Sequence, residues 1–296
     1  MTEFRSYYGK PVLKEPKWKS PDVPIYLYLG GMAGASSTMA LLADLTDRPA
    51  LARSGRVAAA AGATASVGAL VHDLGRPQRF LNMLRVFKPT SPLSIGSWIL
   101  APFSTLAGAG AASELTGLLP SLGRLSASVA GVVGPAMTTY TAVLLADTAV
   151  PAWHEMYREL PFVFAGSAVA SAGAMGMLTA PRRESAPARR MAVAGSVLEL
   201  VATSRMHRRD EFISEVYRQG NSGRILNAAK GLTCAGAVGA LFAGRSRAAA
   251  VLSGLCLSAG ATLTRYGIFH AGKESARDPK YTIIPQRARA EEPAPV

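Results

Sequence analysis

The side chains that could do chemistry in this sequence gather at the ends of long apolar runs. His72 and Asp73 end one run, and Asp147 ends another, seven residues after Tyr140. Residues spaced by about two helical turns lie on the same face, so Tyr140 and Asp147 would point the same way. Histidine has an unperturbed pKa of about 6.5, which suits passing a proton, and a tyrosine hydroxyl can stabilise developing negative charge. We therefore expect a polar layer that binds a small molecule and exchanges protons with it.

Aromatic side chains and one further carboxylate accompany this layer. Tyr26 and Tyr28 begin the first apolar run, and Trp98 lies one turn into the third. We interpret them either as walls of the site or as part of an aromatic belt at the membrane surface. Glu199 stands inside an apolar run, where an ionisable group costs a few kcal/mol and is a functional candidate. The alternative is a Glu199 paired with Arg205 or a neighbouring hydroxyl.

The sequence predicts no metal, haem, iron–sulfur cluster or nucleotide bound to this chain. Cys234 and Cys256 are isolated, without the C-x-x-C spacing of iron–sulfur and zinc sites. No P-loop or dinucleotide fingerprint occurs. A membrane cytochrome needs facing histidines well inside the bundle, whereas the histidines here fall near helix ends: His72, His154, His207 and His270.

These residues must be positioned by helices that cross a membrane. The chain is 49% hydrophobic with a net charge of +13, and its charges fall in short segments between runs such as 94–113. A bilayer takes about 20 apolar residues as a helix, because each backbone polar group must be satisfied within the segment. No alternation typical of a membrane β-barrel occurs. We predict an all-α membrane protein with eight spans: 24–43, 54–74, 94–113, 125–148, 160–180, 189–206, 227–244 and 248–270.

Charge predicts the orientation of these spans. Eight spans place both termini on one face of the membrane. The tails and loops on that face carry about twenty Lys and Arg, against about ten on the other face, so the positive-inside rule puts the termini in the cytoplasm. Because the charge lies beside the membrane, nucleic acid is excluded as a partner. No cleavable signal peptide is expected, since the first residues are polar and basic.

Three stretches resemble the NrfD/PsrC (polysulfide reductase) family of membrane subunits. The first runs from His72 to Pro92 (HDLGRPQRFLNMLRVFKPTSP) and continues into Ser94–Trp98 (SIGSW). The second is Tyr140–Asp147 (YTAVLLAD) followed by Pro-Ala-Trp, and the third is Ala276–Tyr281 (ARDPKY). The resemblance covers nearly the whole chain.

The resemblance implies a fold and a function. Members of this family have eight helices in two four-helix bundles, which here implies a tail at 1–23, bundles at 24–148 and 149–271, and a tail at 272–296. They carry no metal and anchor a ferredoxin-like iron–sulfur subunit, which connects to a molybdopterin or related catalytic subunit. They exchange electrons with menaquinone or ubiquinone in the bacterial cell membrane. The chain is thus expected to be the quinone-reactive subunit of a respiratory oxidoreductase complex.

With the quinone that the resemblance implies, the polar and aromatic residues selected above take roles. The quinone would be bound by Tyr140, Trp98, Tyr26 and Tyr28, with protons moved by His72, Asp73 and Asp147 and a longer proton route through Glu199. At the start of its first helix the chain has Tyr26 and Tyr28 but lacks the His and Asn of the polysulfide enzyme. The basic residues of one loop would dock the acidic iron–sulfur subunit, or alternatively attract lipid headgroups: Arg76, Arg79, Arg85 and Lys88.

Two other functions remain open. Asp44 in Leu-Leu-Ala-Asp echoes Asp147 in the same four-residue motif, at the opposite face, as an inverted repeat of a proton- or ion-coupled transporter would. The chain could also be a structural anchor without quinone chemistry.

Overall fold

The described part of the chain is helical, without strands. A computed structural model describes residues 12–76 and 78–291. The long helices are α1 (Asp22–Asp44), α2 (Pro49–Leu74), α4 (Pro92–Thr116), α5 (Pro120–Ala146), α7 (Leu160–Thr179), α8 (Ala186–Arg209), α10 (Gly220–Phe242) and α11 (Arg247–Arg277). Short helices connect or extend them: α3 (Gln78–Met83), α6 (Pro151–Glu155), α9 (Glu211–Arg218) and α12 (Lys280–Glu291).

The prediction of an all-α membrane protein is confirmed. Seven helices of the described residues are long and apolar enough to cross a membrane. The remaining long helix is α8, which holds the predicted span 189–206 and is a 24-residue helix. It is less apolar because Arg189, Arg190 and Glu199 interrupt its hydrophobic sequence.

Local sequence explains where several helices begin and end. Proline stands in the first turn of α2, α4, α5, α7 and α8, where its missing N–H costs nothing because that donor has no helical partner. Gly75 and Gly117 follow α2 and α4 with φ of 69° and 73°. This left-handed conformation favours glycine and closes a helix. These signals extend several helices beyond the predicted spans without changing their order.

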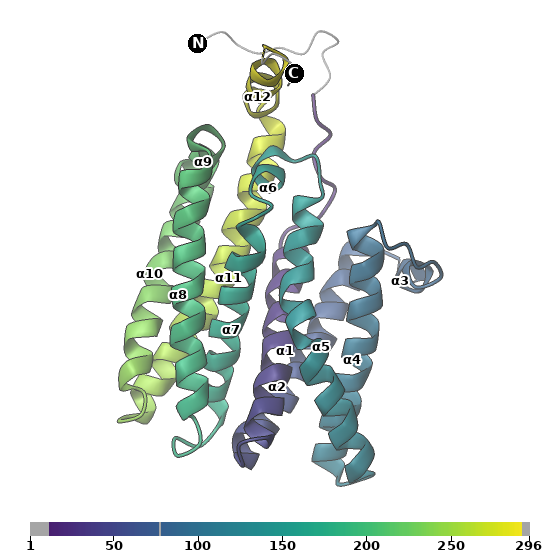
Figure 1. The fold of residues 1–296 in the computed structure, drawn as a ribbon, viewed down its shortest axis with the longest axis vertical. Helices are drawn as coiled ribbons and strands as arrows, with labels where there is room; N and C mark the ends of the chain where they lie inside the picture. The colour runs from purple at the N-terminus through teal and green to yellow at the C-terminus, as the bar shows by residue number, and fades with distance from the viewer. Residues whose placement is uncertain (1–11, 77, 292–296) are drawn as a thin grey trace, which may run out of the picture.

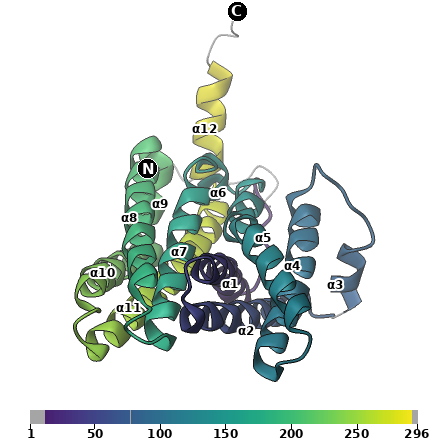
Figure 2. The same ribbon diagram turned by 60° about the horizontal axis from the view of Figure 1, so that its bottom comes forward.

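The long helices pack as two groups of four, as the resemblance implies. Helices α1, α2, α4 and α5 form the first bundle, and α7, α8, α10 and α11 form the second. The bundles meet chiefly where α7 packs on α1 and α5 (Figure 2). Small residues allow close approach within each bundle: a Cβ at Gly34 would lie 2.6 Å from the Gly134 carbonyl oxygen, and one at Gly166 would lie 2.5 Å from the Glu199 nitrogen.

One end of the molecule carries most of the additional structure. Helix α1 begins and α11 ends at this end, which we call the terminus-bearing end, and α6, α9 and α12 lie there too (Figure 1). Helix α3 lies beside α4, away from α12 (Figures 1 and 2). Residues from 272 onward were expected as a tail, but α11 continues to Arg277 and α12 follows, its start held by Asp278, which accepts a hydrogen bond from the Lys280 N–H at 3.0 Å.

Candidate functional site

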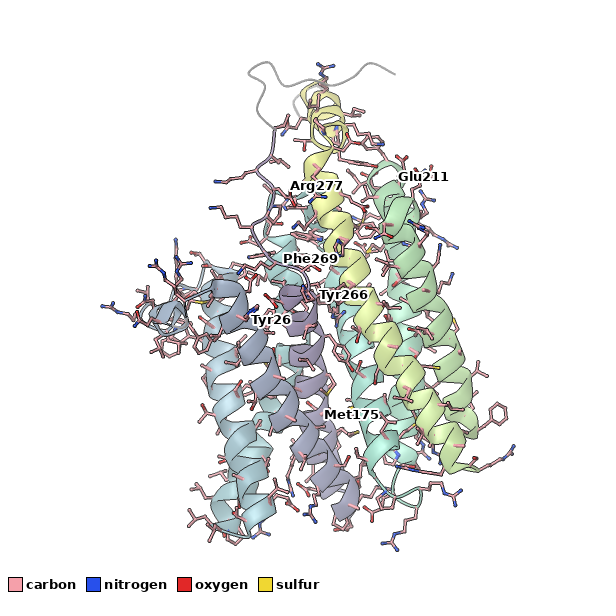
Figure 3. All side chains as sticks on the ribbon, turned by 180° about the vertical axis from the view of Figure 1, so that it is seen from behind. Tyr26, Met175, Glu211, Tyr266, Phe269 and Arg277 are labelled. Atoms are coloured by element: carbon pink, nitrogen blue, oxygen red, sulfur yellow. The ribbon has the colours of Figure 1, made fainter. Side chains whose placement is uncertain are left out.

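A cavity of about 220 Å³ lies in the first bundle, close to the terminus-bearing end. We call it the tyrosine pocket, because Tyr26 of α1 and Tyr140 of α5 line it. Figure 3 shows Tyr26 near the end at which α1 begins. The other walls are mostly apolar and come from α1, α2, α4 and α5: Val23, Leu27, Leu70, Leu100, Leu144 and Leu145. An apolar cavity with a few convergent polar groups is typical of a small-molecule site.

The two tyrosines form a hydrogen-bonded pair inside this pocket. Their hydroxyl groups bond to each other, and the side chains are only 4% and 7% exposed. Gly96 of α4 makes room for the Tyr140 ring, since a Cβ there would lie 2.7 Å from two ring carbons. Each hydroxyl can both donate and accept. The pair can therefore present a hydrogen bond to a ligand oxygen while staying bonded internally.

Polar and aromatic groups border the tyrosine pocket on the side of the terminus-bearing end. Asp73 of α2 and Arg79 of α3 line it, and Asp73 accepts a hydrogen bond from the Lys19 N–H at 2.8 Å. Trp18 also lines the pocket and stacks on Trp153 of α6 with ring centroids 5.7 Å apart. Trp153 in turn donates to the Ile268 carbonyl at 2.8 Å. Segment 12–21 thus connects the pocket to the second bundle.

A second contact holds segment 12–21 against α11. Glu15 accepts hydrogen bonds from Arg277 at 2.8 and 3.1 Å and pairs with Lys273 at 3.0 Å. The hydrogen bonds from Arg277, then Lys273, lower the pKa of Glu15 below its usual value. Glu15 therefore stays ionised at neutral pH and keeps the segment in place.

Several residues predicted for the same site lie outside the tyrosine pocket. His72 has a side chain that is 77% exposed and contacts Asp22, with 2.8 Å between Nδ1 and Oδ2. Trp98 is half-exposed and packs edge-on against Phe87. Tyr28 lies within electrostatic reach of Arg265 in the second bundle. Of the residues predicted for the quinone site, the pocket brings together three, Tyr26, Tyr140 and Asp73.

Asp147 faces a different hollow. It follows α5 and lines an open depression of about 410 Å³ together with His154 and with Tyr281, Thr282 and Gln286 of α12. Leu144 and Leu145, which precede it, line the tyrosine pocket instead. The terminal turn of α5 therefore separates Asp147 from Tyr140.

Glu199 lies in the second bundle and lines a cavity of about 330 Å³ between α8, α9, α10 and α11. Its side chain is 3% exposed, and Thr264 donates a hydrogen bond to Oε1 at 2.7 Å. Its Oε2 atom has no hydrogen-bond partner among the described residues. The cavity extends to Arg218 and Lys230. The expected pairing with a hydroxyl is present, but one carboxylate oxygen remains available.

Arg265 is a buried charge that the sequence analysis missed. It is 1% exposed, and its Nη2 donates to the Phe164 carbonyl at 2.9 Å, with the guanidinium 3.7 Å from the centre of the Phe164 ring. A Cβ at Gly31 of α1 would lie 3.5 Å from Nη2, so this arginine reaches the junction of the bundles. It lies inside the predicted span 248–270, directly after an uncharged run, and the sequence analysis gave it no role. An arginine inside a predicted span was the available signal.

Metal ligands do not cluster in the part of the chain that the structure describes, where no group of three His, Cys, Asp or Glu could hold a metal ion.

Asp44, proposed for an inverted repeat, forms an ion pair with Arg56, which also pairs with Glu114. This interaction connects α1, α2 and α4 at the end opposite to the termini.

Comparison with known proteins gives a family. A family model described as polysulfide reductase, of the NrfD type, matches residues 4–277, nearly the whole chain. No curated protein matches the chain.

Proposed function

Because the chain belongs to the NrfD-type polysulfide reductase family, we propose that it is the quinone-reactive membrane subunit of a respiratory oxidoreductase complex. Electrons would pass between a docked iron–sulfur subunit, connected to a molybdopterin or related enzyme, and menaquinone or ubiquinone. The observation that carries the proposal is the buried Tyr26–Tyr140 pair in an apolar pocket between membrane-spanning helices.

The residues of the tyrosine pocket fit a quinone headgroup. A bound quinone accepts two electrons and two protons to become a quinol. The Tyr140 hydroxyl would donate a hydrogen bond to one ligand oxygen and stabilise charge developing there. Asp73, beside the same pocket, would receive protons from the aqueous end and pass them inward. The apolar walls would hold the ring and exclude water.

Partner docking belongs at the terminus-bearing end in this proposal. Trp18 lines the tyrosine pocket there and stacks on Trp153, and segment 12–21 is held over the bundles by Glu15 and Asp73. A cluster in a subunit bound at this end would be close to the pocket. The charge distribution supports a cytoplasmic position for this end in a bacterial membrane.

The test is quinone-linked activity of the assembled complex. Tyr140→Phe keeps the ring but removes the hydroxyl, and should lower quinone-linked turnover about tenfold, as loss of a hydrogen bond to a charged group does. Activity with an artificial electron acceptor should remain. The matched control is Tyr157→Phe, an exposed tyrosine outside the pocket. Full quinone activity in Tyr140→Phe would show that the quinone site lies outside the tyrosine pocket.

A proton route through the second bundle is a second element of the proposal. The unpartnered Oε2 of buried Glu199, at a cavity reaching Arg218, supports it. In liposomes holding the complex, Glu199→Gln should abolish proton translocation while leaving quinone turnover measurable. Glu211→Gln, at an exposed position where α9 begins, is the control. Unchanged translocation in Glu199→Gln would make this carboxylate structural.

A further inference from the structure

The segment around α3 combines exposed apolar and basic side chains at the edge of the first bundle. We define the α3 segment as residues 78–93, from the start of α3 to the first two residues of α4. Leu81, Val86 and Phe87 are between 59% and 67% exposed. Arg79, Arg85 and Lys88 are exposed as well. In an aqueous setting this much apolar exposure would be unfavourable.

The basic residues of the α3 segment lack acidic partners. No Asp or Glu occurs between Asp73 and Glu114 in the sequence. Among the ion pairs of the described residues, none includes Arg79, Arg85 or Lys88. The charges are therefore available to an external anionic surface.

The α3 segment is held in this position by hydrogen bonds to α4. The Ser94 hydroxyl donates to the Val86 carbonyl and accepts from the Lys88 N–H, both at 3.0 Å. The Ser97 hydroxyl donates to the Met83 carbonyl at 3.3 Å. The exposed apolar side chains are thus part of a fixed arrangement, and Phe87 packs against the half-exposed Trp98 of a membrane-spanning helix.

Position favours lipid over protein as the partner. The segment connects two spans, so it lies at the level of the membrane surface, and it projects sideways past α4, away from α12 (Figures 1 and 2). A protein docked over the termini would leave this segment, with its exposed Leu81 and Phe87, uncovered. Apolar side chains flanked by cations are typical of elements that lie in the interface of acidic membranes.

We propose that the α3 segment is an interfacial anchor that binds acidic phospholipid headgroups through Arg85 and Lys88 and inserts Leu81, Val86 and Phe87 among the acyl chains. Arg79, Met83 and Leu93 of the same segment line the tyrosine pocket, so the anchor holds the lipid-facing wall of that pocket at the bilayer interface. This last consequence rests on the quinone function proposed above; lipid binding does not.

The experiment places a spin label on the full chain in nanodiscs. Leu81→Cys is labelled in a Cys234→Ser, Cys256→Ser background. With phosphatidylglycerol present, the label should be relaxed more by oxygen than by a water-soluble nickel chelate. The substitutions Arg85→Gln and Lys88→Gln each remove one positive charge. Each should lower the ratio of membrane-inserted to water-exposed label about fivefold, which is the effect of one basic residue at an acidic surface.

The control removes two charges elsewhere at the same end. Arg208→Gln with Arg224→Gln, on exposed positions of the second bundle, should leave the label inserted. Equal access of the nickel chelate with phosphatidylglycerol or with phosphatidylcholine alone would overturn the proposal. So would release of a copurifying iron–sulfur subunit by Arg85→Gln and Lys88→Gln without a change at the label, since the segment would then serve a protein. The readout uses no quinone, so it can fail independently of the proposed function.

Discussion

At the scale of residues, the tyrosine pocket differs from the polar layer that the sequence predicted, and His72 and Asp73 show the difference. His72 and Asp73 are adjacent at the end of α2, yet Asp73 lines the tyrosine pocket while His72 faces outward to Asp22. Asp73→Asn keeps the size of the side chain but removes its ability to carry a proton. We predict that it lowers quinone-linked turnover about tenfold, at the lower end of what general acid–base groups contribute.

His72→Ala is the matched comparison. The geometry predicts turnover close to that of the unmodified complex, measured with the same quinone and the same artificial acceptor. Equal losses in both variants would mean that the histidine acts in the site after all, as the sequence alone suggested. A loss in His72→Ala only would exclude the tyrosine pocket as the route of proton entry.

Sequence reasoning reached part of this site for a clear physical reason. Tyr26 and Tyr140 lie at least one turn inside their helices, so the helical period fixes their direction and the shared membrane level brings them together. Asp147 and His72 lie at helix ends, where the last turn and the following loop decide the direction of a side chain. Gly96 and Trp18 could not be selected from sequence, because their importance depends on contacts with another helix or segment.

At the scale of elements, packing of α4 on α5 shapes the pocket. A Cβ at Gly96 would lie 2.7 Å from the Tyr140 ring, so Gly96→Ala must displace that ring. We predict a raised KM for quinone with intact artificial-acceptor activity, measured in the assembled complex. Gly108→Ala on the same helix is the control, because a Cβ there has nothing within 4 Å.

The two glycine variants should also differ in their effect on the stability of α4. Replacing a helical glycine by alanine stabilises a helix by about 1 kcal/mol in soluble hosts, and a Cβ at Gly108 meets nothing within 4 Å, so Gly108→Ala should be neutral or stabilising. A KM for Gly96→Ala that equals the KM for Gly108→Ala would show that the position of the Tyr140 ring does not affect quinone binding.

The elements themselves were the most predictable part of the molecule. Hydropathy located all the long helices, because spanning hydrocarbon requires long apolar runs. Helix α8 is less apolar than the other long helices because of its polar residues. It still packs on α7 as part of the second bundle. Helix α12, in the predicted C-terminal tail, was not predicted. It is polar, and polarity alone does not distinguish a surface helix from a loop.

At the scale of the whole molecule, the two bundles present two different buried polar sites. The first holds the tyrosine pocket, with neutral hydroxyls and an acid beside it, and the second holds Glu199 and basic residues around a larger cavity. Arg265 lies where the bundles meet. This arrangement agrees with the proposal that the first bundle binds quinone and the second moves protons.

Photolabelling of the assembled complex with an azido-quinone tests the central claim most directly. Mass spectrometry of the digested chain locates the bound label, and excess unlabelled quinone identifies specific incorporation. We predict specific label on peptides that line the tyrosine pocket, from the first turns of α1 and α4 and the last turn of α5, and its loss in Tyr140→Phe. Specific label confined to α8, α10 or α11 around the Glu199 cavity would contradict the account.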